Sequence, residues 1–172
     1  MEPRLQALLN RQQAAGFAGL SGTEARAAVR VSAQLLNEAI GAFAGASPAV
    51  RELAVTPRAG NRFDVSVKLA KPAFLPAINL TATIERQPQF PADPTVVLQL
   101  SGIGGMMRFA GPAVGAFGSL PPGVRMDGDR VYIDLRAALA ANRQAEWLQY
   151  VEKLDISTDE GAVVLYVQAR VS

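Results

Sequence analysis

The side chains of this chain that could carry out chemistry are mainly carboxylates, because the sequence contains neither histidine nor cysteine. Without them there is no thiol nucleophile, no serine–histidine triad, no histidine-ligated haem and no zinc site of histidine or cysteine. Asp127, Asp129 and Asp134 could offer oxygen ligands to a cation. A hairpin turn followed by one outward acid explains the same three residues. We favour that interpretation, so no metal site is expected.

Two pairs of acids could in principle act as general acid and general base, namely Glu52 with Asp64 and Asp155 with Asp159. Each pair fits a solvated strand face equally well, and nothing in the sequence marks a pocket around either one. A hydrolase built on carboxylates alone is therefore the least favoured interpretation.

The segment Ser101–Pro122 is rich in glycine and low in charge. Its Gly-Ile-Gly-Gly run resembles a phosphate loop only superficially, since the Lys-Ser/Thr pair and the spacing of a dinucleotide fingerprint are missing. We expect a broken helix around Gly105–Phe117 instead. Adaptable apolar contacts would come from Met106, Met107 and Phe117.

Length and composition favour one soluble domain with a short arm before it. The chain has 172 residues, a net charge of +2 and 49% hydrophobic residues, which is enough to fill a core. Its cations are scattered and its aromatic residues are few, so a nucleic-acid partner is not expected. Neither a signal peptide nor a membrane span is apparent, and the default expectation is a cytoplasmic protein.

Residues 1–20 are expected to form an amphipathic N-terminal arm, in which Arg4–Ala15 is a short helix with leucines on one side. We favour docking of this helix on its own domain, residues 21–172. Peripheral contact with a membrane surface is the alternative, and few cations line the polar face of the helix to support it.

The stretch Ser32–Phe43 predicts the clearest helix of the chain. Ser32 can cap its first turn, and Leu35, Leu36, Ala39, Ile40 and Phe43 recur on one helical face. Alternation of apolar and polar residues predicts short strands at 22–31, 50–56, 62–69, 78–86, 95–100, 124–126, 130–135, 153–158 and 162–171. Short helices are expected at 136–141 and 144–151. The pattern indicates an α+β domain with an antiparallel sheet.

The inward faces of the strands and the helix are expected to supply one apolar interior. Its members would be Leu36, Ile40, Phe43, Phe63, Val65, Val67, Leu98, Ile133, Leu165 and Val167. Pattern alone does not distinguish an ordinary packed core from a hydrophobic cavity, so both interpretations stay open.

Three sequence features resemble a known family. Leu-Leu-Asn at 35–37 follows a strand and opens a helix, a strand pair surrounds Gly-Asn-Arg at 60–62, and Leu120–Leu135 precedes a short helix and a closing hairpin. In this order, Gly22 to Val171 resembles small bacterial lipid-binding domains of the LmeA-like kind, related to the tubular lipid-binding (TULIP) superfamily. The resemblance implies a highly curved antiparallel sheet wrapped around a long helix, with additional short helices, an apolar groove and no catalytic residues.

We therefore expect a protein that is not an enzyme, needs no cofactor and binds a lipid or another apolar small molecule between helix and sheet. Arg108, the only cation of its segment, is a candidate headgroup contact, although a snorkelling surface residue explains it more simply. The residues expected to line the groove are Leu36, Ile40, Phe43, Phe63, Val65, Leu98, Met106, Met107, Arg108 and Phe117. The alternative is a structural or protein-interaction module with a filled core, which could form a homodimer through a sheet edge.

The low charge and the glycines of Ser101–Pro122 predict a segment that gates the groove. Met107→Asp and Phe117→Asp should then weaken the binding of a fluorescent fatty acid. They should also lower the thermal midpoint less than Ile40→Asp does, because only Ile40→Asp places an unpaired charge in the core. Thermal unfolding and ligand titration of the three variants check this. Equal loss of stability at all three positions would indicate a plain core helix.

Overall fold

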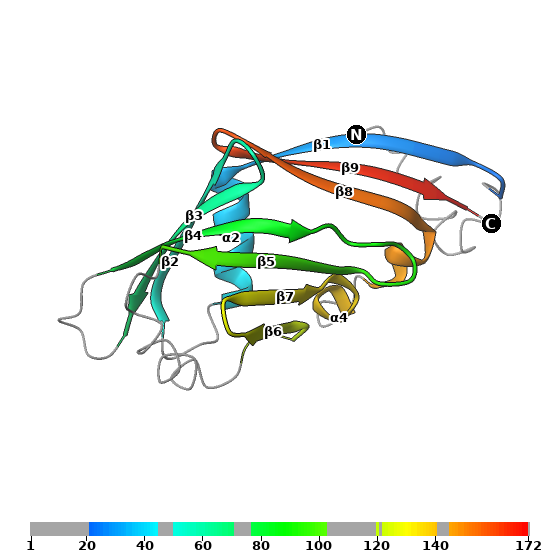
Figure 1. The fold of residues 1–172 in the computed structure, drawn as a ribbon. Helices are drawn as coiled ribbons and strands as arrows, with labels where there is room; N and C mark the ends of the chain where they lie inside the picture. Colours follow the sequence, from blue (N-terminus) through cyan, green and yellow to red (C-terminus); the bar gives the residue numbers. More distant parts are fainter. Residues whose placement is uncertain are drawn as a thin grey trace.

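The computed structural model describes residues 21–44, 50–70, 77–102, 120, 122–140 and 145–171 of the chain. Within these residues the chain forms nine strands in two antiparallel sheets (Figure 1). The same residues contain the α-helices α2 (Ala33–Ala44) and α4 (Leu135–Ala140) and the 3-10 helix η2 (Ala145–Tyr150).

The small sheet joins the two ends of the described chain. Its three strands are β1 (Glu24–Ser32), β9 (Ala162–Arg170) and β8 (Val151–Asp159), in that order, and both pairs are antiparallel. β1 pairs with β9 without a bulge along its whole length. Because successive side chains of a strand point to opposite faces, the alternating pattern gives this sheet one apolar face.

The large sheet is built from the middle of the chain. Its six strands are, in spatial order, β2 (Val50–Arg58), β3 (Arg62–Leu69), β4 (Ile78–Arg86), β5 (Thr95–Ser101), β7 (Arg130–Asp134) and β6 (Val124–Asp127). The turn between β2 and β3 contains Gly60 and Asn61, both with positive φ (81° and 60°). Glycine and asparagine are the residues that adopt this conformation most readily.

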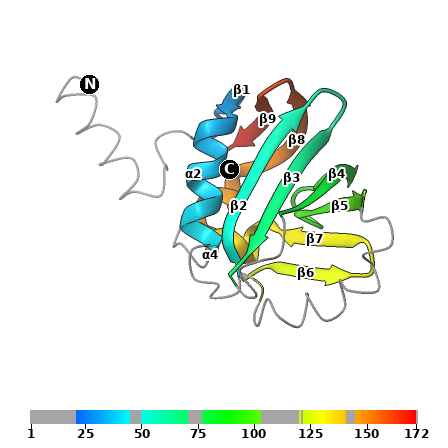
Figure 2. The same cartoon turned by 90° about the vertical axis from the view of Figure 1, so that its left-hand side faces the viewer.

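Helix α2 follows β1 directly, as the sequence predicts. Ser32 Oγ accepts the N–H of Leu35 at 3.2 Å and so caps the first turn. The N–H of Ala33 donates to the carbonyl of Gly161 at 2.8 Å, which anchors the helix start to the β8–β9 turn. The helix then packs along β2, the outer strand of the large sheet (Figure 2).

Helix α4 begins where β7 ends, because Asp134 caps it. Asp134 Oδ1 accepts the N–H groups of Arg136 and Ala137 at 2.9 and 3.0 Å. Gly123, which directly precedes β6, lies beside this cap; its φ is 81°, and a Cβ atom there would lie 2.7 Å from the Asp134 carbonyl oxygen. Only glycine fits there without displacing backbone.

Two side-chain amides bind strands at sheet edges. Asn37 of α2 donates to the carbonyl of Val55 and accepts its N–H, both at 2.7 Å. Gln87, which follows β4, donates to the carbonyl of Ile156 at 2.7 Å and accepts its N–H at 2.9 Å. Val55 lies on the edge strand β2 and Ile156 on the edge strand β8. Each amide therefore makes the two backbone hydrogen bonds that a further strand would otherwise make with that residue.

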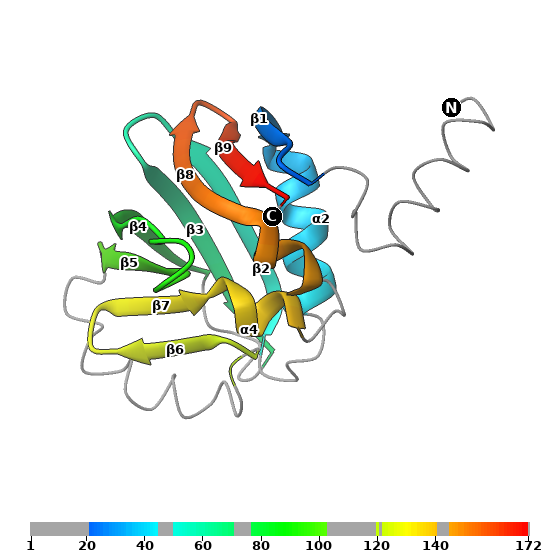
Figure 3. The same cartoon turned by 90° about the vertical axis from the view of Figure 1, so that its right-hand side faces the viewer.

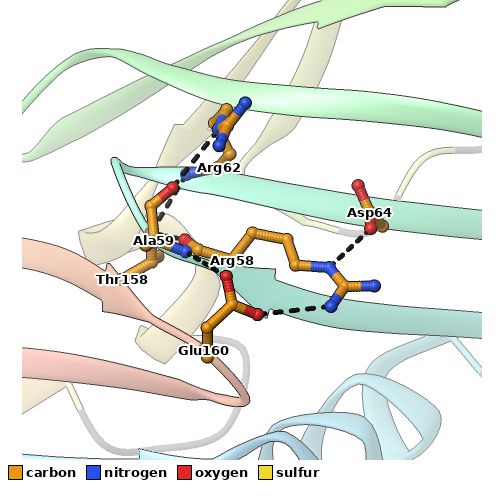
Figure 4. A network of polar contacts seen from close by, with 6 residues as sticks. All are labelled: Arg58, Ala59, Arg62, Asp64, Thr158 and Glu160. Atoms are coloured by element: carbon orange, nitrogen blue, oxygen red, sulfur yellow. Dashed lines mark hydrogen bonds and ion pairs between the residues drawn. The ribbon is translucent and has the colours of Figure 1, made fainter.

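The two sheets are joined at one corner, where the β8–β9 turn meets the β2–β3 turn (Figure 4). The Thr158 hydroxyl donates to the carbonyl of Arg58 at 2.5 Å and accepts the N–H of Arg62 at 3.0 Å. Glu160 accepts the N–H of Ala59 and pairs with the Arg58 guanidinium, both at 3.2 Å. Thr158 is only 4% exposed, so its hydroxyl is both buried and hydrogen-bonded.

The apolar faces of both sheets converge at this corner. Thr158 pairs with Val163 across the small sheet, and Pro57 pairs with Phe63 across the large sheet, which places each on the apolar face of its sheet. Pro57 is fully buried, and its carbonyl accepts the N–H of Gly161 at 2.9 Å. Figure 3 shows the small sheet lying across the β2–β3 end of the large sheet, with α2 beside both.

The structure confirms the predicted antiparallel strands and the presence of a helix after β1, and the bounds of β3 and β4 are those expected. The prediction of a single, highly curved sheet wrapped around a long helix is wrong. The described strands divide between two sheets, neither of them strongly curled. The 12 residues of α2 span about 18 Å, whereas a strand of the length of β2 spans about 30 Å. The predicted arm and the predicted broken helix around Gly105–Phe117 lie outside the described residues.

Removing the amide of Asn37 should destabilise the fold. Asn37→Ala leaves the N–H and carbonyl of Val55 without these partners at a half-buried site, so the free energy of unfolding should fall by about 1–3 kcal/mol. Gln34→Ala is the matched control, because Gln34 makes only an exposed bond to Glu38, and it should change the free energy by less than about 0.5 kcal/mol. Urea unfolding measures both. Equal effects would show that water replaces the Asn37 amide at no cost.

Candidate functional site

One face of the large sheet is apolar along all of its strands. The register aligns apolar residues in rows that cross the sheet. One row consists of Val55, Val65 and Leu80, and another of Ile84, Leu98, Val131 and Met126. The rows between them carry polar residues on the opposite face, such as Thr56, Asp64, Thr81 and Ser101. The alternation of apolar and polar residues along the strands therefore gives the large sheet one apolar face and one polar face.

This apolar face is only partly covered. Pro57, Val67, Ala82 and Val96 are buried on it, but most of its other described side chains, including Phe63 and Leu98, are half-buried. Adjacent strands therefore contribute neighbouring side chains that each keep some apolar surface outside the packed core. We therefore take this face as the candidate site.

The predicted site residues fall into three groups. Phe63, Val65 and Leu98 lie together on the apolar face of the large sheet, with β4 between their strands. Leu36 and Ile40 are half-buried on α2, which packs on β1 and β2. The remaining predictions lie outside what the structure describes, namely the side chain of Phe43 and the residues Met106, Met107, Arg108 and Phe117.

The residues expected to line one interior come from two different sheets. Leu165 and Val167 belong to the small sheet, where they pair with Val29 and Ala27 of β1. Val67 and Ile133 belong to the large sheet. The expected interior set is therefore supplied by two apolar faces, one from each sheet, that converge at one corner.

Two surface depressions lie on the polar faces rather than between helix and sheet. Each has a volume of about 360 Å³ and is open to solvent. The first lies on the large sheet, and its lining includes Thr56, Asp64, Ser66, Asn79 and Thr81. The second lies on the small sheet, and its lining includes Arg26, Lys153, Asp155, Tyr166 and Gln168. Neither depression coincides with the expected apolar groove.

Each acid of the two candidate catalytic pairs forms an ion pair with a lysine or arginine side chain. Glu52 lies 3.6 Å from Lys68, and Asp64 lies 2.6 Å from Arg58. Asp155 and Asp159 are paired with Lys153 and Arg30, in each case at 2.7 Å. These contacts are typical of solvated strand faces. Asp134 is used as the helix cap described above, and in the described part of the chain no acidic cluster could hold a metal ion.

Hydrogen bonds lower the pKa of three exposed acids. The N–H of Ala59, and then the guanidinium of Arg58, lower the pKa of Glu160 below its ordinary value. The side chain of Arg130, bound to Glu85 through two contacts of 2.7 and 2.8 Å, lowers the pKa of Glu85. A hydrogen bond with the Thr95 side chain lowers the pKa of Asp93. Glu160 lies at the corner, Glu85 on β4 and Asp93 in the loop between β4 and β5, and none of the three lines either of the two depressions.

Sequence reasoning missed the roles of Asn37 and Gln87. Both are amides in otherwise unremarkable positions, and each binds a backbone that is distant in sequence, 18 and 69 residues away. The only signal was at Asn37, which belongs to the Leu-Leu-Asn triplet at the helix start. Its partly buried position among apolar neighbours could have indicated a structural hydrogen bond.

Comparison of the chain with protein-family models, with curated proteins and with solved structures finds no match. None of the described helices is both long and apolar enough to cross a membrane.

Acidic pH should reduce the stability that Glu160 contributes at the corner where the two sheets join. The pKa of Glu160 is lower in the folded protein, so its contribution to stability is complete above the ordinary pKa of glutamic acid. This contribution is lost as the pH falls through the lower, folded-state pKa. Glu160→Gln should therefore reduce stability at neutral pH and flatten the decline of stability in acid. The urea midpoint measured between neutral and acidic pH checks this.

Glu38→Gln, on the exposed face of α2, is the matched control and should retain the acid decline. A Glu160→Gln curve that runs parallel to the wild-type curve would contradict a role of Glu160 in the acid response.

Proposed function

We propose that this protein is not an enzyme and binds a lipid or another apolar small molecule on the apolar face of the large sheet. The observation that carries the proposal is the half-buried state of that face in the described residues, across adjacent strands. A membrane lipid or fatty acid has the extended apolar shape that such a surface would cover. The resemblance to LmeA-like and TULIP domains, drawn from the order of elements, supports the same class of ligand.

The energetics of burial favour an occupant of this face. Each Å² of apolar surface removed from water contributes about 25 cal/mol. A row of incompletely buried side chains, such as Ile84, Leu98 and Val131, therefore has some apolar surface left to cover. An acyl chain can cover it without hydrogen-bonding demands, since every backbone group in a central strand is already paired. Selectivity would then depend on shape and on few polar groups.

The chemistry of the described acids supports binding rather than catalysis. The acids of the two candidate pairs are each held by a cation on a polar face. The apolar face itself carries no described acid in the rows named above. A ligand on this face would therefore meet hydrocarbon and little else.

Filling the face with a larger side chain should block the ligand. Leu98→Trp adds bulk in the middle of the apolar face, and we expect it to abolish binding of a fluorescent fatty acid while leaving the thermal midpoint close to the wild-type value. Gln99→Trp is the matched control, because Gln99 is exposed on the opposite face of the same strand, and it should retain binding. Fluorescence titration and thermal unfolding give the two readouts.

The alternative module with a filled core gives a different pattern. Overpacking a closed interior typically costs about 1–3 kcal/mol, so Leu98→Trp would then lower the thermal midpoint. The wild-type protein would also fail to bind the fatty acid. That combination would overturn the proposal.

A further inference from the structure

Among the residues that the structure describes, none pairs with the outer edge of β1, and this sets β1 apart from the other edge strands. β2 carries Pro57, a bulge near Val50 and the Asn37 amide. β8 has a bulge near Val151 and the Gln87 amide, and β6 has only four residues. β1 has nine residues, no proline and no bulge. Proteins usually protect long regular edges, because an unpaired edge is ready to pair with another strand.

The ladder with β9 determines which backbone groups of β1 face outward. The N–H of Ala33 donates to Gly161, and the carbonyl of Thr23 accepts the N–H of Val171. Residues of an antiparallel strand alternate between bonding to one neighbour and facing the other side. The odd-numbered residues of β1 therefore bond to β9. The N–H and carbonyl groups that face the free edge belong to Glu24, Arg26, Ala28 and Arg30, whereas the carbonyl of Ser32 lies at the start of α2.

We infer that two copies of this chain pair through this edge, antiparallel and centred on Ala27, into one continuous sheet. A two-fold pairing must place even-numbered residues opposite even-numbered residues. Centred on Ala27, it sets Glu24 opposite the partner's Arg30 and Arg26 opposite the partner's Ala28. Opposite charges across a strand pair stabilise it, and like charges destabilise it. The charges on β1 thus fit a second copy in this register.

The neighbouring registers are less favourable. A pair centred on Ala28 sets Arg26 opposite the partner's Arg30, and a pair centred on Arg26 sets that residue opposite its own copy. A pair centred on Val29 aligns no opposite charges, and pairs centred closer to the start of β1 share too few residues. Within one chain, Glu24 and Arg30 already form ion pairs of 2.7 Å with Arg26 and Asp159. These pairs are exposed, so they exchange partners at little cost.

The apolar side of β1 agrees with the same register. Val29 is 46% exposed, and Ala25 and Ala27 are also exposed. Centred on Ala27, Val29 faces the partner's Ala25, so the apolar faces of the two small sheets join. This pairing needs no ligand on the large sheet, and its tests therefore do not depend on the proposed function.

A single cysteine tests the register directly, because the chain has none of its own. In Ala27→Cys the two introduced residues would face each other as a non-hydrogen-bonded pair, with Cα atoms about 4.5 Å apart, within disulfide reach. Val29→Cys is the matched control on the same face, and its copies would lie about 13 Å apart. Mild oxidation should give a disulfide-linked dimer from Ala27→Cys only. Equal cross-linking of both variants, or of neither, would overturn this register.

Charge exchange tests the association itself by sedimentation velocity. The wild-type chain should sediment as a dimer, and Glu24→Arg and Arg30→Glu should each sediment as a monomer, because each places like charges opposite one another. A mixture of these two variants should restore the dimer, since an arginine then lies opposite a glutamate in both halves of the pair. Arg26→Gln, opposite the partner's Ala28, is the control and should remain dimeric. A monomeric wild type, or folded variants that do not associate when mixed, would overturn the inference.

Discussion

The architecture depends on one buried hydroxyl group. Thr158 comes from the small sheet, yet its hydrogen bonds go to the backbone of Arg58 and Arg62 at the turn of the large sheet. A buried polar group that loses its partners destabilises a protein far more than an exposed one does. The two turns are therefore fixed relative to each other. Together with the Gly161–Pro57 and Gln87–Ile156 hydrogen bonds, this junction brings the apolar faces of the two sheets together at Pro57.

Polar side chains outside the core also decide where each sheet ends. Asn37 and Gln87 pair with the backbone at the edges of β2 and β8, so those strands are not available to another chain at these points. β1 has no comparable partner among the described residues, and its charges are placed asymmetrically along the strand. Two surfaces of the molecule therefore remain for partners. One is the apolar face that we assign to a ligand, and the other is the strand edge that we assign to a second copy.

Much of the local structure could be predicted from sequence, because local signals specify it. Strict alternation gave the bounds of β3 and β4, and a serine before an apolar helical face marked the start of α2. The division into two sheets could not be predicted. Alternation shows which side chains share a face but not which strands are neighbours, so Leu98 and Leu165 look alike in sequence although they lie in different sheets.

For the candidate site, the sequence predicted which residues share a face but not how far that face is covered. The pattern identified Phe63, Val65 and Leu98 as residues of one face, and the register confirms that they share it. How much of that face stays open depends on what packs over it from distant parts of the chain. That covering is a property of tertiary structure, and no window of sequence reports it.

The pairing of β1 with β9 has a consequence for synthesis on the ribosome. β1 ends at Ser32, but its partner β9 begins only at Ala162, so the small sheet cannot form until the residues up to β9 have been synthesised. The strands of the large sheet, from Val50 to Asp134, are complete earlier. Contacts between segments far apart in sequence form late and slowly. Until β9 has been synthesised, both edges of β1 therefore lack a partner strand, and the strand can pair with other segments during that time.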